Sequence, residues 1–131
     1  MSFAIPPRDC PCGSPWYDDC CGALHRGERQ AASPEELMRS RFSAYALGES
    51  DYVWRTWHPR TRPDNVNLDP ETRWTRLEII NSTDAMVEFR EHFEGLGATG
   101  VLHERSRFAE RAGRWFYLDG VRADRQRRSS A

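Results

Sequence analysis

The sequence of 131 residues predicts an α+β fold with a small cysteine module at its start. Helix signals are confined to the first half of the chain, whereas apolar residues from Trp74 onward recur at every second position, as in strands. Helices followed by a run of strands favour a curved antiparallel sheet of about four strands, packed on two or three helices. The module is indicated by four cysteines, all within the first 21 residues.

The cysteines form two close pairs, Cys10/Cys12 and Cys20/Cys21, separated by seven residues. Four thiolates on one short segment can converge on a single Zn²⁺, which binds such ligands tetrahedrally at about 2.3 Å. A disulfide within either pair would fit normal bridge geometry poorly. Cross-paired disulfides, free thiols and a redox site are the alternatives, but four cysteines without a secretory signal favour metal. We therefore predict a structural zinc site made by Cys10, Cys12, Cys20 and Cys21.

The segment between the cysteine pairs predicts one short helix. Ser14 suits an N-cap, Pro15 suits the first helical position, and Gly22 suits a helix stop. Such a helix would carry the second cysteine pair back over the first. His25 follows closely and could replace one thiolate, although the four cysteines already complete a tetrahedral set.

Two further helices are expected before the strands. Ser33-Pro34-Glu35-Glu36 combines an N-cap, a proline and a capping-box glutamate, so a helix should run from there to about Leu47, with Gly48 as its left-handed terminator. A second helix should run from about Asp51 to Trp57. It should end before His58-Pro59, because a residue before proline disfavours the helical conformation.

The period-2 region predicts four strands, the last two joined by a tight hairpin at Ala112-Gly113. The strands are expected at about residues 74–81, 85–93, 100–110 and 114–121. The chain would then comprise a metal module at 10–22, an α+β domain at 33–121 and a flexible tail at 122–131.

Charge and hydropathy limit the class of partner. The formal net charge is −1, which is unlike the strongly basic profile of a dedicated nucleic-acid binder. No apolar run approaches the roughly 20 residues of a membrane span. The first residues lack the basic and apolar regions of a secretory signal. We expect a cytoplasmic protein that spans no membrane, and a nucleic-acid-binding module is a third hypothesis that the charge disfavours.

Arg41 and Glu104 are the first candidates for a ligand site. Arg41 lies within the apolar stripe of the predicted helix at 33–47, and Glu104 shares the inward parity of its strand with Leu102. A buried charge costs several kcal/mol unless it is paired, so Arg41 should meet Glu104, Glu91 or Asp51. The structural interpretation is a salt bridge. The functional one is the polar floor of a pocket in which Glu104 is a general base or binds a ligand.

Trp57 and His58 are further candidates for that pocket. A histidine at a helix end beside tryptophan could exchange protons near neutral pH. The structural alternative is a capping or packing role.

Several segments resemble known families. Residues 10–22, Cys-Pro-Cys-Gly-Ser-Pro-Trp-Tyr-Asp-Asp-Cys-Cys-Gly, are similar to the zinc-binding SEC-C motif. Other segments resemble the YchJ-like bacterial family: Leu37–Tyr45, Thr56–Pro59, His103–Phe108 and Trp115–Gly120. The resemblance implies a zinc module joined to a cone-shaped domain like nuclear transport factor 2 (NTF2), with a cavity. The lysines usual in the SEC-C loop are replaced here by residues such as Trp16, Asp18 and Asp19, which disfavours an acidic or nucleic-acid partner.

These observations lead to two hypotheses for function. The first is a zinc-binding accessory or adaptor protein that recognises a protein partner or a small ligand through the module or the cavity. A closed thiolate set has no position for a catalytic water, so its zinc would be structural. The alternative is a cofactor-free enzyme of hydrolase, isomerase or dehydratase type, with Glu104 and His58 as the acid/base pair; it rests on fold analogy.

Overall fold

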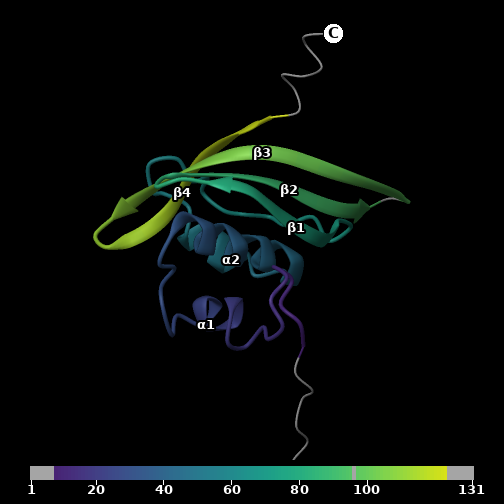
Figure 1. The fold of residues 1–131 in the computed structure, drawn as a ribbon, viewed down its shortest axis with the longest axis horizontal. Coiled ribbons are helices and arrows are strands. Elements are labelled where there is room, and N and C mark those ends of the chain that lie inside the picture. Colours follow the sequence, from purple (N-terminus) through teal and green to yellow (C-terminus); the bar gives the residue numbers. More distant parts are fainter. Residues whose placement is uncertain (1–7, 96, 124–131) are drawn as a thin grey trace, which may run out of the picture.

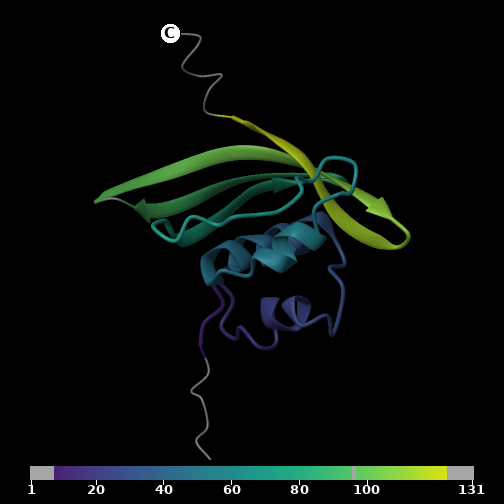
Figure 2. The same cartoon turned by 180° about the vertical axis from the view of Figure 1, so that it is seen from behind.

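The fold was analysed in a computed structural model that describes residues 8–95 and 97–123. Three helices precede four strands: α1 (Cys21–His25), α2 (Pro34–Leu47), α3 (Ser50–Arg55), β1 (Arg73–Ser82), β2 (Met86–Gly95), β3 (Ala98–Arg111) and β4 (Arg114–Arg122). The prediction of an α+β fold with a four-stranded antiparallel sheet is confirmed. Helix α2 lies under the sheet, and α1 lies on the far side of α2 (Figures 1 and 2).

Helix α2 begins and ends where its sequence predicts. The Ser33 side chain accepts a hydrogen bond from the Glu36 backbone N–H at 3.1 Å, and Pro34 occupies the first turn. Gly48 ends the helix in the left-handed conformation, with φ 77°. An N-cap hydrogen bond of this kind contributes about 1 kcal/mol, so the boundaries of α2 are fixed by local chemistry.

The prediction of a helix between the two cysteine pairs is wrong. Residues 11–20 form turns and bends, and α1 begins only at Cys21. Gly22 lies inside α1 rather than ending it. Its N–H donates to the Tyr17 carbonyl at 2.8 Å, and a Cβ at this position would lie 2.7 Å from that oxygen. The glycine is therefore explained by the close approach of α1 to the Tyr17 turn.

The sheet is an antiparallel meander in the order β1-β2-β3-β4. Its register pairs Phe89 with Glu104 and Glu91 with Leu102, so the predicted inward parity of these strands is confirmed. The hairpin at Ala112-Gly113 has φ values of 53° and 78°. The core between the sheet and α2 consists of Leu37, Met38, Phe42, Leu77, Val87, Phe89 and Phe108.

The predicted cysteine module and α+β domain share contacts. Leu24 of α1 is buried together with Ala44 of α2 and with Tyr52 and Val53 of α3. Leu24 lies between the two expected ranges, 10–22 and 33–121, and its contacts link the module to the domain.

The predicted tail, residues 122–131, is described only at its first two positions, and Arg122 ends β4. The rest of that prediction lies outside the described residues. None of the helices within 8–95 and 97–123 has the length and apolar character to cross a bilayer.

Replacing Gly22 by Ala tests the packing of α1. Glycine to alanine inside a helix normally stabilises by about 1 kcal/mol. Here the added methyl group would press on the Tyr17 carbonyl, so we expect a net destabilisation of roughly 1–3 kcal/mol. Thermal unfolding monitored by circular dichroism measures it. A melting temperature at or above that of the unmodified protein would contradict this packing.

Candidate metal centre and ligand cavity

Two local structures bring the four cysteines together. The first is a turn in which the Cys10 N–H donates to Ser14 O and the Gly13 N–H donates to Cys10 O, both at 2.9 Å. Gly13 has φ 110°, a conformation that residues with a side chain rarely adopt. The second is the start of α1, where the Cys20 N–H donates to Tyr17 O at 3.0 Å. The turn and the helix start therefore face each other with two sulfurs each.

The four sulfurs lie within 4.8 Å of one another. Cys12 Sγ is 3.6 Å from Cys20 Sγ, and Cys20 Sγ is 3.9 Å from Cys21 Sγ. A tetrahedron with metal–sulfur bonds of about 2.3 Å has edges of about 3.8 Å, so these separations fit one central ion. No disulfide joins the four cysteines. The cluster could hold a metal ion.

Helix α2 packs against the cysteine cluster. Ser43 Oγ lies 3.4 Å from Cys10 Sγ, and Arg39 Nη1 donates to the Cys12 carbonyl at 3.2 Å. Hydrogen bonding to Cys10 and Cys12, together with burial, raises the pKa of the Cys21 thiol. A cation among the sulfurs would oppose this effect, since it stabilises thiolates.

His25, considered above as a replacement for one thiolate, instead forms a structural link. Its Nε2–H donates to the Ser40 carbonyl of α2 at 2.8 Å, and Tyr17 OH donates to its Nδ1 at 2.7 Å. Burial lowers the pKa of His25, which favours the neutral ring that this arrangement requires. Both ring nitrogens are therefore engaged in joining the Tyr17 turn to α2.

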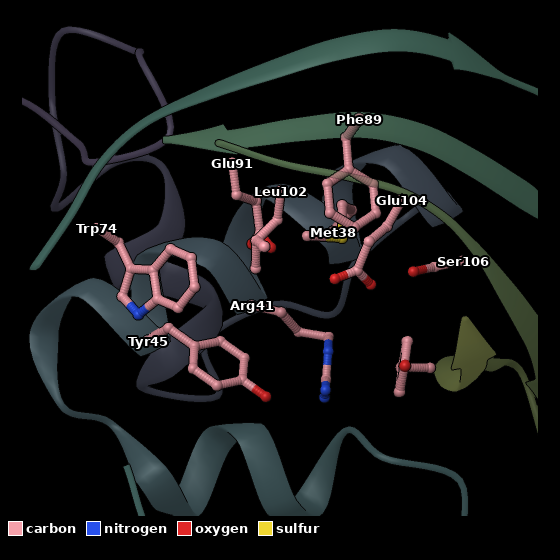
Figure 3. Close-up of a pocket in the computed structure, with 10 residues that line it drawn as sticks. Met38, Arg41, Tyr45, Trp74, Phe89, Glu91, Leu102, Glu104 and Ser106 are labelled. Carbon is pink, nitrogen blue, oxygen red and sulfur yellow. The ribbon is translucent and has the colours of Figure 1, made fainter. Parts of the chain in front are cut away.

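A separate cavity of about 240 Å³ lies between α2 and the sheet (Figure 3). Every strand of the sheet contributes to its walls. The lining residues are Met38, Arg41, Tyr45, Trp74, Phe89, Glu91, Leu102, Glu104, Ser106 and Tyr117. Aromatic and aliphatic side chains with a few convergent polar groups are typical of small-molecule sites.

Arg41 is the buried cation of this cavity, with 3% of its surface exposed. Its Nη1 donates to the Val53 carbonyl and to Thr56 Oγ1, both at 2.8 Å. The guanidinium also lies over two rings, 4.5 Å from the centre of Tyr117 and 5.4 Å from that of Trp57. These contacts anchor the end of α3 to α2 and use only neutral groups.

The predicted ion pair of Arg41 with a carboxylate is wrong for the described residues. Arg41 has no ion pair within 4 Å among them, and Asp51 pairs instead with Arg55 in α3. Glu104 is 3.8 Å from Arg122 Nε of β4. Glu91 is close enough for Arg41 to lower its pKa slightly, but not to form a contact pair.

Glu91 is the more deeply buried of the two carboxyl groups, with 8% of its surface exposed. Burial, and then repulsion from Glu104, raises the pKa of Glu91 to about 8. The two side chains lie diagonally on the same face of β2 and β3. At neutral pH the Glu91 side chain is therefore mainly a neutral hydrogen-bond donor.

The predicted pocket set of Arg41, Glu104, Trp57 and His58 is only partly brought together. Arg41 and Glu104 line the cavity, and Trp57 lies behind Arg41. His58 is not among the lining residues, and its ring lies 5.9 Å from that of Phe116.

Strand alternation explains the position of His58. Its backbone N–H donates to the Tyr117 carbonyl at 2.7 Å. The adjacent Phe116 and Tyr117 point to opposite faces of β4. The Tyr117 ring enters the cavity, while His58 lies beside Phe116 on the other side. Because both parities of β4 are apolar, the sequence pattern could not reveal this.

Ser106 and Tyr45 also line the cavity, and the sequence pattern indicated their orientation only in part. Ser106 has the same inward parity as Glu104, and Tyr45 lies one helical turn after Arg41. Neither stands out as a functional residue in the sequence pattern.

Comparison with known proteins agrees with this architecture. The family model described as "YchJ, middle NTF2-like domain" matches residues 33–120. A UPF0225 protein of Streptomyces coelicolor is 47% identical over 124 residues, covering 88% of this chain and 97% of that protein. A UPF0225 protein of Deinococcus radiodurans is 47% identical over 121 residues, covering 91% and 93%.

Two solved structures are similar along most of their length. A SEC-C motif containing protein from Rhodopseudomonas palustris, solved in solution, has 39% identity and a TM-score of 0.78, covering 88% of this chain and 99% of that one. A SEC-C motif containing protein from Psychrobacter arcticus, solved by crystallography, has 26% identity and a TM-score of 0.70, covering 91% and 84%. This chain therefore belongs to the YchJ-like UPF0225 family and carries the family's SEC-C motif ahead of its NTF2-like domain.

Proposed function

We propose that this protein is a zinc-binding accessory protein that binds a small organic ligand in the cavity between α2 and the sheet. The observation that carries the proposal is Arg41, a buried guanidinium at a cavity that also holds two carboxyl groups and three hydroxyl groups. Burying a charge is costly, and a ligand that interacts with it would recover part of that cost. The cone-shaped enclosure implied by the family is part of this proposal.

Structural zinc at Cys10, Cys12, Cys20 and Cys21 is the second part of the proposal. Its support is the set of sulfur separations near 3.8 Å and the preference of Zn²⁺ for four thiolates. A closed set of four sulfurs suits a structural ion. Free thiols also support a location in the reducing cytoplasm.

A protein partner for the cysteine module is a further candidate. Trp16 is 52% exposed in the loop between the cysteine pairs, and Asp18 and Asp19 follow it. Exposed tryptophans are frequent anchors at protein interfaces. The acidic flank would favour a basic partner.

The enzyme alternative also has one specific observation in its favour. Glu91, with its pKa raised to about 8, lies beside Glu104 in the cavity. Two neighbouring carboxyl groups in unlike environments can divide the roles of acid and base. Such a pair would replace the predicted pair of Glu104 and His58, since His58 lies outside the cavity.

A cavity-filling pair of variants tests ligand binding. Leu102 lines the cavity, whereas its neighbour Val101 is on the opposite face of β3 and is exposed. Compounds of up to about twelve heavy atoms with acid, amide, amine or alcohol heads would be screened by amide chemical shifts in NMR. We expect binders to lose affinity at least tenfold in Leu102→Trp and to keep it in Val101→Trp. Equal affinity in both variants would place the binding elsewhere.

Zinc binding is tested by metal analysis of the purified protein. We expect one zinc per chain, and its removal by a chelator should lower the melting temperature by roughly 10 °C or more. Cys21→Ser should lose the ion. Ser43→Ala, which alters a neighbour of Cys10 but no ligand, should retain it. A zinc-free, reduced protein with an unchanged melting temperature would defeat the zinc proposal.

The raised pKa of Glu91 predicts how stability depends on pH. The group titrates near 8 in the folded protein and near its ordinary 4.5 when unfolded. Between these values the folded state binds more protons, so the free energy of unfolding falls as pH rises, by at most about 1.4 kcal/mol per pH unit.

Glu91→Gln should remove this dependence. Urea unfolding at several pH values from about 5 to 9 would measure it. We expect a flatter profile for the variant and a greater stability than the unmodified protein at the alkaline end. Parallel profiles would show that Glu91 has an ordinary pKa.

A further inference from the structure

The charges around the cavity do not balance at neutral pH. It is lined by one cation, Arg41, and by two carboxyl groups, Glu91 and Glu104. Glu104 is close to a second cation, Arg122. Glu91 is mainly protonated because burial raises its pKa to about 8. Within the part of the chain that the structure describes, Arg41 has no ion pair within 4 Å, although it is almost fully buried.

The N–H donors of Arg41 on Nε and Nη2 form the edge of the guanidinium that commonly binds carboxylates. A guanidinium has five N–H donors, and the Nη1 donors are directed at Val53 O and Thr56 Oγ1. Among the described residues, Nε and Nη2 have no hydrogen bond beyond an interaction of the guanidinium with the Tyr45 hydroxyl. An edge made of Nε and Nη2 can bind both oxygens of a carboxylate at once.

The cavity also has an apolar lining. Trp74 of β1, Phe89 of β2 and Leu102 of β3 contribute apolar side chains, and they alternate with the carboxyl groups, since Phe89 pairs with Glu104 and Leu102 with Glu91 (Figure 3). The volume of about 240 Å³ is below the roughly 300–1,000 Å³ of pockets for drug-sized ligands. A ligand with one polar head and a small flat or branched apolar body would match this lining and this size.

We propose that the cavity binds a small monocarboxylate, with its carboxylate on the free edge of Arg41 and its apolar body against Trp74, Phe89 and Leu102. This inference rests on the proposed ligand-binding function and names the class of ligand. The Tyr45 hydroxyl from α2, and the Ser106 hydroxyl and the protonated Glu91 from the sheet, also line the cavity as further donors. An amine would instead meet the buried guanidinium and lose affinity through repulsion.

Three probes that share a benzyl group but differ in the charge of the head group test the proposal. Phenylacetate, phenylacetamide and benzylamine would be titrated into the zinc-loaded full chain near pH 6.5, with NMR shifts as the readout. We expect phenylacetate to bind about 10- to 100-fold more tightly than phenylacetamide, as is usual for a hydrogen bond to a charged group. Benzylamine should bind most weakly.

Variants of Arg41 assign the effect to its charge. Arg41→Gln should remove the preference for phenylacetate over phenylacetamide, because the contact between the two opposite charges is lost. Arg41→Lys keeps a charge without the bidentate edge and should fall between the two. Since Arg41 also holds the end of α3, each variant would first be checked for native amide signals.

A second readout does not depend on changing Arg41. The titratable and charged groups that face Glu91 are Arg41 and Tyr45 from α2, Glu104 from β3 and Tyr117 from β4. Burial raises the pKa of both tyrosines, that of Tyr117 to about 12, so Glu91 alone should ionise between pH 7 and 9. Affinity for phenylacetate should fall at least tenfold over this range in the unmodified protein and stay level in Glu91→Gln.

The outcomes separate the ligand class from the function itself. Equal or tighter binding of phenylacetamide or benzylamine, at shifts that map to the cavity, would overturn the carboxylate proposal and leave ligand binding intact. If phenylacetate, benzoate and isovalerate all fail to bind while amides or amines bind, the carboxylate proposal is likewise overturned. If no compound of any class binds in the cavity, the proposed function fails as well.

Discussion

The structure depends on helix α2 being buried on two sides. One side faces the sheet through Leu37, Met38 and Phe42, and the other faces the cysteine module through Ser40 and Ser43. A helix with a single apolar stripe cannot satisfy both neighbours. Ser40 and Ser43 are small enough for the neighbouring elements to approach α2 closely. Their hydroxyl groups still form hydrogen bonds, Ser40 with Tyr52 and Ser43 with Cys10. The order of the layers therefore follows from the faces of one helix.

The same helix connects the candidate metal centre to the ligand cavity. Arg39 and Ser43 contact the cysteine segment, and Arg41, between them in sequence, enters the cavity. His25 adds a third link through the Ser40 carbonyl. A metal that orders the cysteine turns would thus stabilise the position of α2 and, with it, the cation of the cavity. In this arrangement a structural ion would contribute to ligand binding without touching the ligand.

The sequence predicted those features that are set by local chemistry or by strand parity. Ser33 and Gly48 gave the bounds of α2, and the alternation in β2 and β3 gave the inward positions of Glu91 and Glu104. Features set by tertiary contacts were missed. Gly22 is required because α1 approaches the Tyr17 carbonyl closely. His58 is positioned by a hydrogen bond to Tyr117 of β4, a strand in which both sets of alternate residues are apolar. The periodicity of apolar residues does not predict either of these two contacts.

The surroundings of Arg41 argue for a ligand and against a purely structural role. Arg41 joins α2 to the end of α3 through neutral groups. If its charge had only this structural role, a carboxylate would be expected in direct contact, because an unpaired buried charge is unfavourable. Two carboxyl groups lie on the facing strands, yet Glu104 is near Arg122 and burial keeps Glu91 protonated at neutral pH. The guanidinium of Arg41 therefore lies at the cavity without an ion pair to either carboxyl group of the facing strands. Such an arrangement costs stability in the empty protein, and a bound anion would offset that cost.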